Sequence, residues 1–188
     1  LLDSTLNGLE QLGFFEEEKL SKKGYWAANL CTSLVLELAE LIESGLLNTK
    51  DRERLVAVIA AISADHYRPY LSSKDSLISK EDQETLSGII ERVKDLEIPG
   101  VQDERAVVPD AAYTAVLWMK TDSWQTFRSL LILSGVAEGD AARLITQTAE
   151  HLNQISRLSE EFPELATIAE ETRHRLLRPP LTEVLRAE

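Results

Sequence analysis

The stretch LEQLGFFEEEKLSKKGYWAANLCTSLVLELAELIESGLL, residues 9–47, joins a short turn-rich unit to a long apolar helix, and it decides the fold. Phe14, Phe15 and Leu20 flank a charged centre, and Gly24 closes the unit. Apolar residues around a short polar run, followed by glycine, are typical of a small hairpin or an extended turn. The first half of the stretch therefore predicts a hairpin unit.

The second half of the stretch has the apolar spacing of a core helix. Between residues 25 and 44, apolar side chains recur every three or four positions, and Gly45 supplies the stop. Glu37 and Glu40 fall on the polar side of this predicted helix. Cys31 lies in its apolar run, so we expect a buried thiol in the core. As the single cysteine of the chain, it has no partner for an internal disulfide or a zinc site.

The composition indicates an all-α protein. The chain has 188 residues, of which 44% are hydrophobic, with only 8 glycines and 6 prolines. This is enough for one substantial core, and it favours long helices over strands and turns. A net charge of -12 argues against binding nucleic acid or an anionic membrane over the whole surface. Any contact with nucleic acid must therefore be local.

Further helices follow from the same periodicity and from capping residues. Asn48 and Thr49 are expected to begin a helix that ends before Pro69, and Ser79 and Pro109 begin two more. The later helices are expected over residues 123–133 with Asp122 as cap, 138–159 and 163–177. We predict a short helix plus a turn or hairpin unit over residues 1–24 and a helical bundle over residues 25–188, which together form one compact domain.

The sequence lacks the motifs of an autonomous enzyme. It contains no GxxxxGK[ST] phosphate loop, no DExH box, no glycine-rich dinucleotide turn and no GxSxG elbow. The histidines His66, His151 and His174 are scattered, and none has a second ligand at metal-binding spacing. No run approaches the length of about 20 apolar residues that a transmembrane helix needs. The N-terminus lacks a signal pattern, so we expect a cytoplasmic or organelle-matrix location.

Two polar clusters remain as candidate binding residues. The first is ADHYRPYL, residues 64–71, in which Asp65 and Arg68 accompany aromatic rings at the end of an apolar helix. One interpretation is a helix end at which Arg68 satisfies carbonyl groups and the tyrosines pack. The other is an exposed rim that touches a base or a ribose by stacking and hydrogen bonding. The sequence leaves both open.

The second cluster is a polar stripe on the predicted helix at residues 138–159. Arg143, Gln147, Gln154 and Arg157 recur at spacings of three, four and seven, opposite the apolar face. Such a stripe is either an ordinary solvated face or a contact surface.

The order of several segments resembles a known family. The segments are LGFF followed by LSKKGYWAANL, then LELAELIESGLL, then LVAVIAAISADHYRP, and then VPDAAYTAVLWMKTDSWQTFRSLLILSGVAEGDAARLITQTAEHLNQI. In this order they resemble DSHCT, the C-terminal helical domain of superkiller-type superfamily 2 DEAD/DEAH-box RNA helicases. Each segment is a weak signal alone, and the information lies in their order. The chain also begins at Leu1 without an initiator methionine, which fits a piece of a longer protein.

The resemblance implies a helical bundle that packs on two RecA-like motor domains of the same chain. Its long ratchet-like helix would contact the unwound strand, single-stranded RNA or, as a second choice, DNA. The family's arginine after the EG turn matches Arg143, and an acidic residue at the end of the second core helix matches Asp65. A second basic pair on the family's long helix is replaced by Thr146 and Gln147, so the contact would be less salt-sensitive.

The resemblance also implies what this chain does not bind. ATP and Mg²⁺ would act between the motor domains of the parent helicase, with no cofactor or metal in this fragment. We expect no membrane and no small-molecule substrate as partners.

Two other functions fit the same sequence. Residues 123–133, the turn SGVAEGD and the helix after it can form a helix-turn-helix of a DNA-binding regulator, although the acidic balance and the few basic residues of the second helix argue against it. An acidic helical scaffold that binds a basic protein is the other alternative.

Overall fold

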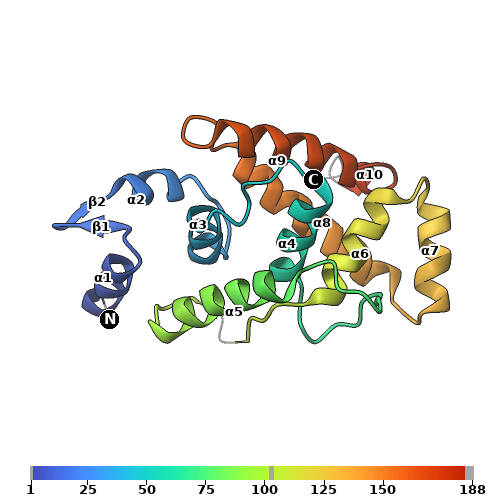
Figure 1. Cartoon of the computed structure of the whole chain (residues 1–188), viewed down its shortest axis with the longest axis horizontal. Helices are drawn as coiled ribbons and strands as arrows, with labels where there is room; N and C mark the ends of the chain where they lie inside the picture. The colour runs from blue at the N-terminus through green and yellow to red at the C-terminus, as the bar shows by residue number, and fades with distance from the viewer. Residues whose placement is uncertain (1, 102–103, 185–188) are drawn as a thin grey trace.

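A helical bundle with one small hairpin makes up the described part of the chain (Figure 1). The computed structural model describes residues 2–101 and 104–184. The prediction of an all-α fold is confirmed. The end of the predicted tail segment and two residues of the connection before Pro109 lie outside the described residues.

Helix α4 (Arg52–Ser63) is the centre of the bundle. All of its residues from 55 to 63 are buried, because the neighbouring helices cover it on several sides. Helices α6 (Pro109–Lys120), α8 (Glu138–Ser156) and α9 (Pro163–Leu176) pack against it, and α8 also packs along α9. An apolar helix with no polar face can be stable only in such a position.

The remaining helices surround this centre. They are α1 (Leu2–Gln11), α2 (Lys22–Ala27), α3 (Val35–Glu43), α5 (Lys80–Asp95), α7 (Trp124–Leu133) and the short α10 (Leu181–Val184). Helices α9 and α5 run along opposite sides in Figure 1, α7 lies at one end, and α1, α2 and the hairpin lie at the other end.

The predicted hairpin is present. Strands β1 (Phe15–Glu16) and β2 (Lys19–Leu20) pair antiparallel. Glu17 and Glu18 between them have φ angles of 49° and 64°, the positive values at both turn positions that a tight two-residue hairpin requires. Gly24 closes the unit. This position requires glycine, because a Cβ there would lie 2.2 Å from the carbonyl oxygen of Phe14.

The prediction of a single helix over residues 25–44 is wrong. The structure contains two helices, α2 and α3, with an irregular connection over residues 28–34. Side chains replace the missing helical hydrogen bonds: the Cys31 N–H donates to Gln154 at 3.0 Å, and the Leu34 N–H donates to Thr32 at 3.1 Å. Cys31 is exposed, contrary to the expected core thiol, because it lies in this connection.

Two carboxylates predicted on a solvated face are buried. The Glu40 side chain accepts hydrogen bonds from Lys23 and Arg92, and Lys23 also donates to the Leu12 carbonyl at 2.6 Å. These contacts join α2 and α5 to α3. Burial raises the pKa of Glu37, the second buried carboxylate, against the opposing effects of a backbone hydrogen bond and of the charge on Arg105.

Helix starts were predicted more accurately than helix ends. Ser79 caps α5 by accepting from the N–H of Asp82 at 3.0 Å, and Pro109 opens α6. The caps of two other helices are one to three residues further along than expected, at Asp51 and Ser123. Helix α4 ends at Ser63, before the ADHYRPYL segment, so Asp65 and its neighbours lie in a connection.

Candidate nucleic-acid interface

Helix α8 is packed on most of its circumference. It contacts α4, α6, α7 and α9, which leaves an open strip with the exposed residues Gly139, Arg143, Glu150 and Arg157. Along the predicted stripe, Arg143 and Arg157 are exposed and Gln147 is half-buried. The rise of 1.5 Å per residue places these two arginines about 21 Å apart along the helix axis. Arg157 makes no ion pair with any residue that the structure describes, whereas Arg143 does.

Gln154 lies in the same stripe but is only 3% exposed. Its amide oxygen accepts from the Cys31 N–H, and its amide nitrogen donates to the Glu150 carboxylate at 2.6 Å. The connection between α2 and α3 therefore covers this part of the helix. The open part of the stripe consists of Arg143, Gln147 and Arg157.

Four charged side chains gather at the N-terminal end of α8. Arg68 contacts the carboxylates of Asp65, at 3.1 Å, and of Asp140, and Arg143 Nε lies 3.4 Å from the same Asp65 carboxylate. Asp140 is in the first turn of α8, where the helix dipole favours a negative charge. The structure thus brings together the two predicted clusters, Asp65 and Arg68 of the first and Arg143 of the second, in a group whose formal charges balance.

The segment ADHYRPYL, residues 64–71, has aromatic rings both in the core and in solvent. Arg68 N–H donates to the Asp65 carbonyl at 3.1 Å, which closes a turn with His66 and Tyr67 at its centre. Both central residues are exposed, whereas Tyr70 is buried at 8% exposure. Each of the two interpretations of ADHYRPYL therefore describes part of the segment, although Arg68 binds carboxylates and not the helix carbonyls.

A buried polar contact that the sequence did not predict lies behind the stripe. His151 of α8 contacts Ser63 Oγ through Nδ1 at 2.7 Å and Thr32 Oγ1 through Nε2 at 2.9 Å. Ser63 gives its hydroxyl hydrogen to the Ile59 carbonyl, so it accepts from Nδ1–H, and Nε2 accepts from Thr32. Burial, together with the charge of Arg105, lowers the pKa of His151 to about 4. Its partners come from distant parts of the sequence, which is why no local pattern revealed them.

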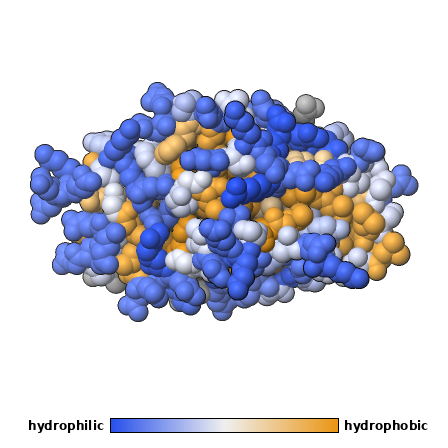
Figure 2. All heavy atoms as spheres, viewed as in Figure 1, coloured by the Kyte–Doolittle hydropathy of each residue, from blue (hydrophilic) through white to orange (hydrophobic). Residues whose placement is uncertain are grey.

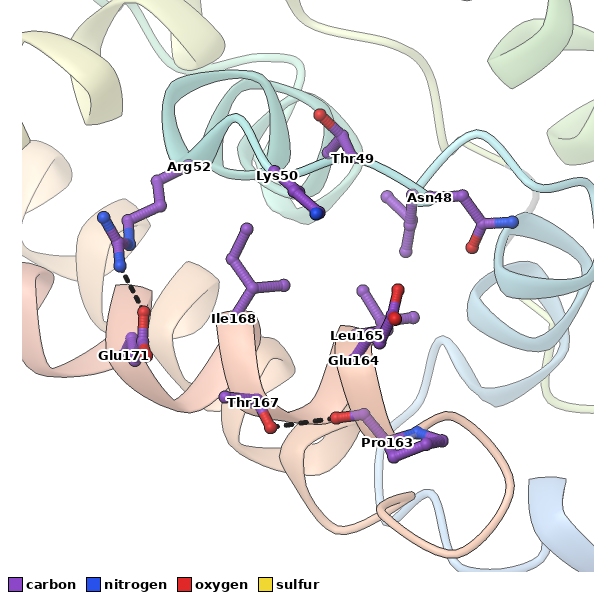
Figure 3. Close-up of a pocket in the computed structure, with 11 residues that line it drawn as sticks. Asn48, Thr49, Lys50, Arg52, Pro163, Glu164, Leu165, Thr167, Ile168 and Glu171 are labelled. Atoms are coloured by element: carbon purple, nitrogen blue, oxygen red, sulfur yellow. Dashed lines mark hydrogen bonds and ion pairs between the residues drawn. The ribbon is translucent and has the colours of Figure 1, made fainter.

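A separate cavity of about 650 Å³ lies between the connection before α4 and the start of α9 (Figure 3). An ion pair between Arg52 and Glu171 lies at one edge of it, and its other charged residues, Lys50 and Glu164, have opposite signs. This balanced lining does not select for an anion or a cation, and the cavity shares no residue with the stripe.

Two other features are absent from the described residues. Neither residues 2–101 nor residues 104–184 contain a group of three or more His, Cys, Asp and Glu side chains that could hold a metal ion. Within the same ranges, no helix has both the length and the apolar character needed to cross a membrane.

Comparison with known proteins identifies the family. A search of curated proteins found no match. The family model described as the DSHCT (NUC185) domain matches residues 17–183, which cover the second half of the hairpin, helices α2 to α9, most of α10 and the whole stripe of α8. The chain therefore belongs to the DSHCT domain family, the helical C-terminal domain associated with superkiller-type helicases.

Proposed function

We propose that this domain packs on the RecA-like motor of an ATP-dependent RNA helicase and guides the unwound strand along helix α8. The observation that carries the proposal is the open strip of α8. Arg143, Gln147 and Arg157 lie on the side of α8 that its neighbours leave open, together with the exposed Glu150. A single strand laid along such a strip would meet a cation near each end, with the Gln147 amide and the exposed Glu150 carboxylate between them.

A patch of apolar residues supports contact with the motor domains. Leu130, Ile132 and Leu133 are exposed at the end of α7, where Leu133 reaches 84% exposure. Figure 2 shows apolar surface gathered at the end of the molecule where α7 lies. The opposite face of α7 packs through Phe127 and Leu131. Clustered exposed apolar residues mark interaction surfaces, and adjoining domains of a helicase are a suitable partner.

The charge of the domain restricts how the strand is held. At a net charge of -12, most of the surface repels a phosphate backbone, so the strand would be confined to the strip that carries the arginines. In this account ATP and Mg²⁺ act in the motor domains, and single-stranded RNA, or as a second choice DNA, is the partner of α8. The bundle closes one side of the strand channel and performs no chemistry itself.

Substitution of Arg143 tests the proposal in the full helicase. Arg143→Ala should lower the rate of unwinding about tenfold, since one charge-assisted contact contributes roughly 1.4 kcal/mol or more. The slope of log affinity for single-stranded RNA against log salt should become shallower by about 0.7, the value for one phosphate contact on a single strand. ATP hydrolysis without RNA should not change, since the motor is intact.

Arg128→Ala is the matched control. Arg128 is an exposed arginine on α7 that pairs with Glu138, and it lies off the strip. Its loss should leave unwinding and the salt slope unchanged. If Arg143→Ala behaves like Arg128→Ala, Arg143 has no part in strand guidance and the acidic scaffold becomes the better account.

The helix-turn-helix alternative is disfavoured by the position of α8. Helices α7 and α8 do follow each other across a short turn at residues 134–137. A recognition helix must project far enough to enter the major groove. Helix α8 instead packs against α4, α6 and α9 as well as α7.

A further inference from the structure

We propose that Tyr67 is a stacking platform for a nucleobase of the strand that passes over Arg143. This inference rests on the proposed function and adds a residue and a type of contact to it. The chemical class of the ligand is an unpaired nucleobase, bound by its flat face and without sequence preference.

The turn that carries Tyr67 is fixed at both ends. A hydrogen bond joins its first and last residues, since Arg68 N–H donates to the Asp65 carbonyl at 3.1 Å. Shortly after it, Tyr70 and Leu71 are buried, and Leu71 N–H donates to Thr114 Oγ1 of α6 at 2.9 Å. The turn is therefore held firmly enough to present a ring in a constant position, which reduces the entropy lost on binding.

Tyr67 gains little from its place within the domain. The residue is 67% exposed. Among the described residues, its ring lies edge-on to the His66 ring at 5.6 Å and 5.5 Å from the Arg68 guanidinium. Both neighbours belong to the same turn. Tyr70, three residues later, shows that the segment can bury a tyrosine when packing requires it.

Arg68 links this ring to the strip on α8. Its guanidinium is bound to Asp65 and Asp140, and Asp65 also contacts Arg143. With two carboxylates already bound, Arg68 is better suited to position Tyr67 than to hold a phosphate. Arg143, which contacts the same Asp65 carboxylate and whose side chain is 53% exposed, is then the cation left to meet a phosphate. Aromatic rings beside a basic strip are the usual means of binding single strands without reading their sequence.

The test measures the affinity of the full helicase for a single-stranded RNA oligonucleotide of mixed sequence, without nucleotide. Tyr67→Ala should weaken binding about fivefold or more, the lower end of the effect of losing one stacked base. Tyr67→Phe keeps the ring and should bind within about twofold of the unchanged protein. Because no charge is lost, the salt slope should stay the same for Tyr67→Ala, unlike for Arg143→Ala.

Tyr25→Ala is the matched control. Tyr25 is also a tyrosine with 67% exposure, but it lies on α2, at the other end of the molecule from α7. Its substitution should leave RNA affinity unchanged. Thermal unfolding of each variant checks that the fold is intact.

The outcomes separate this inference from the proposed function. If Tyr67→Ala binds like Tyr25→Ala while Arg143→Ala is impaired, stacking on Tyr67 is overturned and strand guidance stands. If Tyr67→Phe loses as much affinity as Tyr67→Ala, the hydroxyl and not the ring makes the contact, which also overturns the inference. If neither Tyr67→Ala nor Arg143→Ala changes binding, both proposals fail.

Discussion

At the scale of single residues, His151 connects the fold to pH. The folded protein holds it neutral between Ser63 and Thr32, with a pKa of about 4 where the ordinary value is 6.5. Burial is the main cause, and the nearby charge of Arg105 acts in the same direction, while that of Glu150 opposes it. Between pH 6.5 and pH 4 the unfolded chain therefore binds a proton that the folded chain does not.

This difference predicts a loss of stability in acid. The free energy of unfolding should fall as the pH drops from 6.5 toward 4, with about 2 kcal/mol lost from His151 between pH 7.5 and pH 5. Urea unfolding at both pH values measures this. In His151→Gln the part of the loss due to His151 should disappear, whatever the cost of the substitution itself. The exposed His66→Gln is the control and should keep the full dependence, and an equal dependence in both variants would show that His151 is not the group responsible.

At the scale of elements, the connection between α2 and α3 depends on α8. Gln154 reaches from α8 to the Cys31 N–H, and His151 reaches to Thr32 in the same connection. Two polar side chains one turn apart thus fix seven irregular residues, 28–34, against α8. The N-terminal helix and hairpin follow, because they are attached through α2.

Removing Gln154 should therefore affect stability. Gln154→Ala leaves a backbone N–H and the Glu150 carboxylate without this partner, and we expect a loss of about 1–3 kcal/mol in the free energy of unfolding. Gln147 is also a glutamine of this stripe, but it is half-buried. Gln147→Ala should therefore lower the free energy of unfolding by less than about 0.5 kcal/mol. Urea unfolding of the two variants gives the comparison. Equal small effects would mean that the Gln154 contact does not hold the connection.

Local signals predicted some elements and missed others for physical reasons. The hairpin and the start of α5 depend on neighbours in sequence, and both were predicted. The break at residues 28–34 depends on Gln154, more than 100 residues away, so the apolar spacing alone indicated one continuous helix. Glu40 was assigned to solvent for the same reason: its partners Lys23 and Arg92 come from other helices.

The candidate site shows the same limit. Helical periodicity placed Arg143, Gln147 and Arg157 on one face, and all three have open surface in the structure. The same periodicity also put Gln154 there, since it cannot show which part of a polar face another segment covers. The meeting of Asp65 with Arg143 depends on how α8 lies against the connection after α4, which no spacing within either segment reveals.

At the scale of the whole molecule, the domain combines an acidic body with the open strip on α8 and an apolar patch at the end of α7. The strip and the patch are separate surfaces. A strand guide needs this separation, because the patch would be covered by the motor while the strip stays open to the channel.

The most direct test places a photoreactive residue on the strip. In the full helicase, p-benzoylphenylalanine in place of Gln147 should crosslink to the RNA strand during ATP-driven unwinding. The same residue in place of Gln125, an exposed glutamine on α7, should not. Crosslinking at position 147 alone is the predicted result. A helicase that unwinds normally with no crosslink at position 147, or with equal crosslinking at both positions, would contradict strand guidance by α8.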